Sequence, residues 1–157
     1  MKLYLVQHGE AKSKAEDPQR PLTERGRDDV ARVAAFAART GLQVRQIRHS
    51  GKCRAGETAS ILAEHLSPAE GVVAISGLAP KDDVHPMAEA LSSLMAEQRG
   101  AVMLVGHLPF LDRLAGLLVT GNADRSIVRF QKGGIVCLVR EDESWAVGWL
   151  VTPDLIS

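Results

Sequence analysis

The chain has 157 residues, of which 45% are hydrophobic and 24% charged, the composition of an ordinary globular domain that can bury a core. Its 19 basic and 19 acidic residues give a formal net charge of zero. The chain therefore lacks the basic excess that is typical of nucleic-acid-binding proteins, and it lacks the acidic excess that is typical of a disordered arm. Aromatic residues make up 4%, too few for a base-stacking surface.

The first apolar run, residues 3–6, is too short for a signal-peptide core or for a membrane span, which needs about 20 apolar residues. The two cysteines, Cys53 and Cys137, form no framework of repeated spacings, which favours free thiols over disulfides. We therefore expect a cytoplasmic protein that has neither a membrane nor a nucleic acid as its partner.

Strand-like and helix-like segments alternate along the chain, which predicts an α/β fold with a mainly parallel sheet. Apolar runs predict strands at residues 2–6, 44–49, 71–75 and 101–105. Helical spacing of apolar residues predicts helices at 23–39, 52–66, 83–98 and 109–119. Thr23 is the predicted N-cap of the first helix, and Gly41 ends it. The fourth strand is apolar throughout, as expected for a central strand covered on both faces.

The last part of the chain has a different character, because residues 135–140 and 145–151 are typical of two strands joined by a tight polar turn. Trp145 and Trp149 have the same strand parity, so we expect both to cover one face of the sheet. No repeat or linker divides the sequence. Residues 1–157 are expected to form a single domain, a three-layer α/β/α sandwich with a C-terminal hairpin.

His8 and His107 each stand at the end of an apolar strand and beside a glycine. Parallel strands end at the same edge of a sheet, so the two imidazoles are expected to meet in one crevice. A neighbouring glycine has no Cβ and lets backbone and ligand approach closely. A metal site made by the two histidines is an alternative interpretation of the same pattern.

Two further segments carry candidate anion-binding residues. Residues 50–59 open the second predicted helix, where free N–H groups and the helix dipole favour an anion. Arg54 in the first turn opposes that dipole, and an anionic ligand would remove the conflict. A solvated surface arginine is the alternative. Pro21 and Thr23 are typical of a rigid start of the first helix. Arg20, which precedes them, is then able to point into the same crevice as the two histidines.

Four ordered motifs combine these residues: Gln7-His8-Gly9-Glu10-Ala11, Arg20-Pro21-Leu22-Thr23, Ser50-x-x-x-Arg54-Ala55-x-x-Thr58-Ala59 and Val105-Gly106-His107-Leu108-Pro109. Together they resemble the histidine phosphatase superfamily, and within it the short phosphohistidine phosphatases of the SixA type. The resemblance runs from Leu3 through the final hairpin. It implies a phosphoglycerate-mutase-like fold and a phosphatase that needs no cofactor and no metal.

The resemblance also implies roles for the site residues. Neutral His8 would attack phosphorus and become phosphorylated, and water would then hydrolyse the phosphoenzyme. Arg54 and His107 match the family's phosphate-binding positions, and His107 would serve best with both ring nitrogens protonated. Ser50 would add a hydroxyl donor, and Arg20 a further contact to phosphate.

Gln7 departs from the arginine-histidine-glycine motif of the family. Glutamine donates a hydrogen bond but brings no charge and no bidentate fork, so weaker phosphate binding is expected. Arg20 or Lys52 would supply the missing charge in one account. In a second account the enzyme acts on a labile bond, and in a third the chain is a catalytically weakened phosphate-binding module. The second account fits phosphohistidine, because protonated imidazole is a good leaving group.

Asp83 is the candidate general acid, because it stands where the short phosphatases carry an aspartate. The alternative is that Asp82 or Asp83 caps the following helix. His49 and Cys53 are too few for a metal site, which needs three or four ligands. His65 is placed to complement the dipole at a helix C-terminus.

The function expected from these residues is hydrolysis of phosphohistidine on a phosphorylated protein, a phosphohistidine-bearing domain, with inorganic phosphate as the product. A small phosphorylated substrate, cleaved by a phosphomonoesterase, is the alternative. A mutase is disfavoured, because it must hold its substrate in an enclosed site between two transfers.

Overall fold

The computed structural model describes residues 1–97 and 100–156, and within these residues six strands form one sheet in the order β3-β2-β4-β1-β5-β6. Four parallel strands make up most of it: β1 (Lys2–Gln7), β2 (Gln46–His49), β3 (Val72–Ala74) and β4 (Val102–Gly106). The C-terminal hairpin adds two antiparallel strands, β5 (Ile135–Glu141) next to β1 and β6 (Ser144–Val151) at the edge. The α/β class and the mainly parallel sheet are confirmed.

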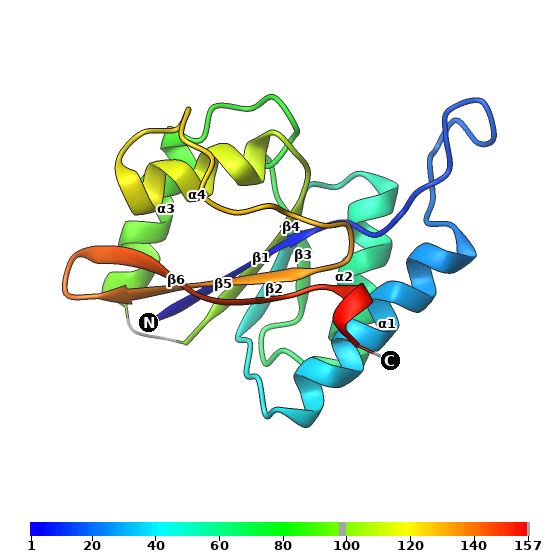
Figure 1. Ribbon diagram of the computed structural model, residues 1–157, viewed down its shortest axis with the longest axis horizontal. Coiled ribbons are helices and arrows are strands. Elements are labelled where there is room, and N and C mark those ends of the chain that lie inside the picture. Colours follow the sequence, from blue (N-terminus) through cyan, green and yellow to red (C-terminus); the bar gives the residue numbers. More distant parts are fainter. Residues whose placement is uncertain (98–99, 157) are drawn as a thin grey trace.

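Helices cover both faces of this sheet, as Figure 1 shows. One face carries α1 (Glu24–Arg39) and α2 (Cys53–Leu66), and the other carries α3 (His85–Ala96) and α4 (Phe110–Thr120). A short 3-10 helix, η1 (Pro153–Leu155), follows β6. The expected end of the third helix at Gln98 lies outside the described residues. In the part of the chain that is described, no helix is both long and apolar enough to cross a bilayer.

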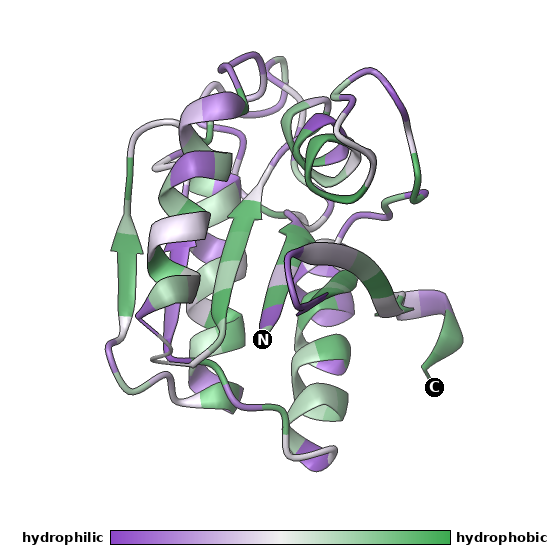
Figure 2. Ribbon diagram, turned by 90° about the vertical axis from the view of Figure 1, so that its left-hand side faces the viewer, coloured by the Kyte–Doolittle hydropathy of each residue, from purple (hydrophilic) through white to green (hydrophobic). Residues whose placement is uncertain are grey.

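The central strands β1 and β4 pack against helices on both faces, and green predominates along the middle of the sheet in Figure 2. Successive side chains of a strand point to opposite faces. Leu3 and Leu5 of β1 therefore pack into the α3/α4 layer, while Tyr4 and Val6 pack into the α1/α2 layer. Each fully buried leucine contributes about 1.5–3 kcal/mol relative to an exposed one. The central strands thus form a rigid base from which their carboxyl ends present polar residues.

The first helix begins and ends where the sequence predicts. Thr23 is its N-cap, and the Thr23 Oγ1 accepts the backbone N–H of Gly26 at 2.9 Å. A cap of this kind stabilises a helix by about 1 kcal/mol. Thr40 is the C-cap, and Gly41 follows with φ of 79°, a left-handed conformation that glycine adopts without strain.

The expectation that Trp145 and Trp149 cover the same face is wrong. The register of the hairpin shifts between Cys137 and Leu138, because Gly148 is an extra residue in β6 without a partner. This β-bulge reverses the parity of the strand. Trp145 therefore packs in the α3/α4 layer, whereas the Trp149 ring lies 5.9 Å from that of Tyr4, in the opposite layer.

Candidate functional site

The ends of β1 and β4 bring the two predicted histidines together. Gln7 pairs with Gly106 in the parallel register, and the His8 backbone N–H donates to the Gly106 carbonyl at 3.1 Å. The ring centroids of His8 and His107 are 5.0 Å apart, with their planes inclined at 52°. Both side chains are nearly buried, with 7% and 2% of their surface exposed. The juxtaposition follows from two strands ending side by side.

One hydrogen bond fixes the tautomer of His8. Its Nδ1 lies 2.7 Å from the Gly9 carbonyl oxygen, which only accepts, so Nδ1 carries the proton and Nε2 keeps a free lone pair. Burial lowers the pKa of His8 to about 4, outweighing the bond to Gly9, which raises it. Three cations lower this pKa further, namely Arg54, Lys132 and Arg20. At neutral pH the ring is therefore neutral and nucleophilic at Nε2.

His107 is held through its other ring nitrogen. Its Nε2 lies 2.6 Å from the Ser50 hydroxyl, while its Nδ1 is buried and meets no partner in residues 1–97 and 100–156. Burial lowers the pKa of His107 to about 3, and positive charges act in the same direction, from His8, Arg54, Lys52 and Arg20. The ring is thus neutral at neutral pH and carries one N–H. A dianion placed beside it would favour the charged form.

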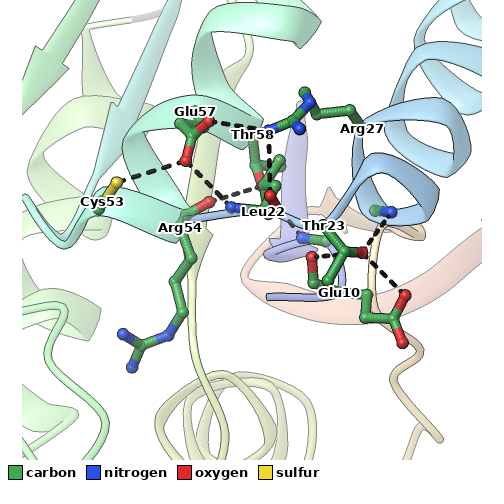
Figure 3. Close-up of polar contacts among 10 residues, drawn as sticks. Glu10, Leu22, Thr23, Arg27, Cys53, Arg54, Glu57 and Thr58 are labelled. Carbon is green, nitrogen blue, oxygen red and sulfur yellow. Dashed lines mark hydrogen bonds and ion pairs between the residues drawn. The ribbon is translucent and has the colours of Figure 1, made fainter. Parts of the chain in front are cut away.

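Arg54 projects from the start of α2 toward this cluster. The helix begins at Cys53, and its N-cap, Lys52, makes no side-chain capping bond. Figure 3 shows the guanidinium of Arg54 directed away from the neighbouring hydrogen-bonded residues. Its Nε is buried without a partner among the described residues, and burial lowers the pKa of Arg54. A buried guanidinium N–H without an acceptor is costly, which is the expected condition of an anion-binding group.

Thr58 links Arg54 in α2 to the segment that follows β1 and carries His8. The fully buried Oγ1 of Thr58 accepts the backbone N–H of Gly9 at 3.0 Å and donates to the carbonyl of Arg54 at 2.8 Å. Glu57 joins α2 to the loop between β1 and α1 (Figure 3), because its Oε1 accepts the Leu22 N–H at 3.0 Å. These bonds fix α2 relative to His8. Sequence reasoning assigned Thr58 to a motif but gave it no role.

The segment after His8 also packs directly against α1. A Cβ at Gly26 would collide with the carbonyl oxygen of Glu10, and a Cβ at Gly9 would lie 2.8 Å from Cγ2 of Val30. Real Cβ atoms do not come so close, so both positions require glycine or a backbone shift. The segment that follows His8 is therefore held between α1 and α2.

Arg20 belongs to the loop that leaves the body of the molecule between β1 and α1, drawn in blue in Figure 1. An isolated bridge between Ala11 and Leu22 closes this loop. Arg20 has φ of 52° and donates from Nε to the Lys12 carbonyl at 3.0 Å. Its positive charge lowers the pKa values of His8 and His107, and its contact with phosphate stays a prediction.

All the charges that lower the pKa values of the two histidines are positive. Four of them belong to cationic side chains: Arg20, Lys52, Arg54 and Lys132. The fifth is the charge of a protonated His8, which acts on His107. In the described part of the chain, none of the four forms an ion pair. Sequence reasoning missed Lys132, since it lies in a turn before β5 that carries no motif. Four unpaired cations around two neutral imidazoles are arranged to receive an anion.

Gln7 and Asp83, two further residues of the predicted site, do not act on the pKa of either histidine. Gln7 is 8% exposed, and its carbonyl accepts the Gly133 N–H at 2.9 Å. Asp83 accepts the backbone N–H of His85 at 3.1 Å and the His85 Nδ1 at 2.8 Å. These bonds lower the pKa of the exposed Asp83 carboxyl, which is ionised at neutral pH. Asp83 is not among the charges acting on either histidine, and its role as an acid stays a prediction.

The remaining histidines and thiols lie outside this cluster. His49 Nδ1 accepts the Gly51 N–H at 3.1 Å, and the Cys53 thiol donates to Glu57 at 3.3 Å. His65 lies in the last turn of α2, as predicted, and Cys137 is buried in the core. Across the described residues, no group of three or more His, Cys, Asp or Glu side chains could hold a metal ion.

Comparisons with known proteins agree with this geometry. The family model of the histidine phosphatase superfamily (branch 1) matches residues 3–79. An uncharacterized protein from Picosynechococcus sp. is 34% identical over 142 residues, which cover 88% of this chain and 84% of that protein. The solved structure of the protein histidine phosphatase SixA complexed with tungstate has a TM-score of 0.88 at 23% identity, covering 99% of both chains.

A second solved structure has the same fold at lower identity. The mycobacterial glucosyl-3-phosphoglycerate phosphatase in complex with VO3 has a TM-score of 0.73 at 15% identity, covering 94% of this chain and 97% of that one. The fold is thus shared by proteins described as acting on a protein phosphohistidine and on a small phosphorylated molecule. The phosphoglycerate-mutase-like architecture expected from the resemblance is confirmed.

Proposed function

The chain belongs to the histidine phosphatase superfamily, and on that basis we propose that it hydrolyses phosphohistidine on a protein through a phosphorylated His8. Membership of this superfamily supports phosphatase activity in general. The observation that carries the proposal is the pair of neutral histidines surrounded by four unpaired cations. A phosphoryl group is the anion that matches both halves of this arrangement, because it needs cations for its oxygens and a nucleophile for its phosphorus.

The chemistry follows from the tautomer of His8. The lone pair on Nε2 attacks phosphorus in line and forms a new P–N bond, while the substrate P–N bond breaks and its electron pair goes to the substrate imidazole, which is protonated. Water then attacks the phosphorus of phospho-His8, inorganic phosphate leaves, and the lone pair returns to Nε2. The Nδ1–H bond to Gly9 stabilises the positive charge that the ring carries while phosphorylated.

The phosphoryl oxygens require donors that are already in place. Arg54 offers a guanidinium whose buried Nε meets no partner in the part of the chain that is described, and His107 offers a ring that gains a proton beside a dianion. Ser50, at 2.6 Å from His107, is able to orient that ring or to donate to phosphate itself. Gln7 adds no charge, so binding depends on the remaining cations.

The surroundings of the two histidines favour a substrate with a good leaving group. The charges acting on them are positive, and the candidate acid Asp83 is ionised and bonded to His85. A phosphate ester leaves as an alkoxide and needs an acid, whereas a phosphorylated imidazole leaves as a neutral ring after protonation. A small phosphate ester is the second candidate, supported by the shared fold of the mycobacterial phosphatase.

The test is phosphate release from two substrates, a phosphohistidine-bearing protein domain and an aryl phosphate. We expect release from the first at a rate at least about 10⁴-fold above that of the His8→Ala variant, since removing a nucleophile has effects of this order. His65→Ala, which changes a histidine on the far end of α2, is the matched control and keeps the activity.

Each result decides between the candidates. Release from the aryl phosphate alone, lost in His8→Ala, would establish the small-molecule phosphatase instead. Equal inactivity of wild type and His8→Ala on both substrates, with phosphate still bound, would leave a phosphate-binding module.

A further inference from the structure

The turn that precedes β5 lies against the residue that departs from the family motif. Gly134 N–H donates to the Gln131 carbonyl at 3.0 Å, and Gly133 has φ of 79°, the pattern of a type II turn with Lys132 at its second position. The preceding N–H in the chain, that of Gly133, donates to the Gln7 carbonyl at 2.9 Å. Lys132 is therefore one residue away from a direct bond to the strand end that carries His8.

Lys132 borders a hollow whose lining also includes the acidic residues Glu10, Asp29 and Asp154, but its charge is not neutralised there. The side chain is exposed, and no carboxylate among residues 1–97 and 100–156 forms an ion pair with it. It lowers the pKa of His8 and does so more strongly than Arg20, while Lys52 acts on His107 instead. The two lysines thus act on different histidines, and the turn that carries Lys132 is bonded to the Gln7 backbone.

The other candidates for the missing charge are less well placed. Arg20 donates its Nε to the Lys12 carbonyl, which orients its guanidinium from within the loop. Lys52, the N-cap of α2, acts on His107 and is not among the cations that lower the pKa of His8. Neither is attached to the Gln7 backbone, whereas the turn that carries Lys132 is.

We propose that Lys132 is a phosphate-binding residue that supplies, from the turn before β5, the positive charge that Gln7 does not bring. The inference rests on the proposed function, since it assumes a phosphoryl group at Nε2 of His8. A lysine is a mobile point charge rather than a rigid fork. It would attract the phosphoryl oxygens without fixing their orientation, leaving orientation to Arg54 and His107. Lys132, Arg54 and His107, which lie far apart in the sequence, would thereby bind the same phosphoryl group.

The test is a double-mutant cycle on oxyanion binding, with inorganic phosphate and tungstate as probes and calorimetry as the readout. We expect Lys132→Met to weaken binding about tenfold, the size of one charge-assisted contact. Gln7→Arg is expected to tighten binding and to reduce the loss caused by Lys132→Met to about twofold or less, because the two cations then serve the same oxygens. Lys2→Met, at the other end of β1, is the control and leaves binding unchanged.

A loss equal to that of Lys2→Met would overturn the proposal, and so would an undiminished loss in the Gln7→Arg background. If Gln7→Arg does not fold, Gln7→Lys replaces it, and NMR titration of wild type and Lys132→Met gives a second readout. Removal of the lysine charge must raise the titration midpoint of His8, and an unchanged midpoint would contradict the inference. Binding is measured without turnover, so an inactive protein that shows the expected cycle refutes the phosphohistidine phosphatase but not the role of Lys132.

Discussion

The ends of β1 and β4 look alike in sequence but differ in the structure. Each strand delivers a buried histidine next to a glycine, and the two rings lie 5.0 Å apart. The Nδ1 of His8 is bound to a carbonyl, which leaves Nε2 free. In His107 it is Nε2 that has a partner, the Ser50 hydroxyl, and Nδ1 that has none among the described residues. The strand end positions an imidazole, and its hydrogen-bond partner decides what the ring does.

The difference has a simple physical reason. A carbonyl oxygen only accepts, so it imposes one tautomer on His8, whereas a hydroxyl both donates and accepts and leaves His107 able to change its protonation. A nucleophile needs a permanently free lone pair, and a phosphate ligand benefits from a proton that appears with the anion. The pairing of carbonyl with His8 and hydroxyl with His107 therefore suits the two proposed roles.

The strongest test of this comparison is to remove each ring in turn and to trap the phosphoenzyme. His8→Ala is expected to abolish acid-labile phosphorylation of the protein, since no other ring has a free Nε2 in that position. His107→Ala is expected to slow phosphorylation by about 10²–10³-fold and to leave the label on His8, the size typical of losing one transition-state donor. Label on His107 in the His8→Ala protein would reverse the assignment.

The second test is the response of the two rings to pH. NMR titration is expected to give midpoints near pH 4 for His8 and near pH 3 for His107, and added phosphate is expected to protonate His107 at neutral pH. Both folded-state pKa values lie below 6.5, so the unfolded chain takes up protons first. The free energy of unfolding must then fall as the pH drops from 6.5 to 4, approaching about 1.4 kcal/mol per pH unit for each ring.

Denaturant unfolding at several pH values measures this slope, and the His8→Gln variant is expected to lose its own share of it. A free energy of unfolding that does not decrease between pH 6.5 and pH 4 would contradict the buried, neutral state of the two rings.

The smallest effect concerns the hydroxyl that distinguishes His107. Ser50→Ala removes the partner of Nε2 and is expected to lower the rate of phosphate release about tenfold or less, because one neutral hydrogen bond contributes about 0.5–1.5 kcal/mol. Ser50→Thr keeps the hydroxyl and is the matched control. Steady-state kinetics on the phosphohistidine substrate measures both. A Ser50→Ala rate as low as that of His107→Ala would mean that the hydroxyl, rather than the ring, is the main donor.

Much of the fold could be predicted from the sequence, because its signals are local. The continuous apolar run at 101–105 and the cap at Thr23 are properties of neighbouring residues, and both predicted elements are found within a residue or two. The meeting of His8 and His107 was also predictable, since parallel strands share one carboxyl edge. That rule needs only the strand ends and not the side-chain geometry.

What could not be predicted depends on contacts between distant residues or on a single inserted residue. The bulge at Gly148 places Trp149 on the opposite face of the sheet from Trp145, and no local pattern in the sequence predicts it. The turn that carries Lys132 is held at the end of β1 by the bond from the Gly133 N–H to the Gln7 carbonyl, which joins residues far apart in the sequence. The neutral state of His107 follows from burial among cations, which the resemblance alone does not reveal.

The close contact between Gly26 and Glu10 joins the start of α1 to the segment that follows His8. The absence of a side chain at Gly26 lets the backbone of Glu10, two residues after His8, lie directly against the helix. Substitutions at residue 26 should therefore be tolerated poorly by activity even where they favour helix formation. If His8 has the proposed role, a library of variants should show residue 26 to be as sensitive as the residues that surround His8.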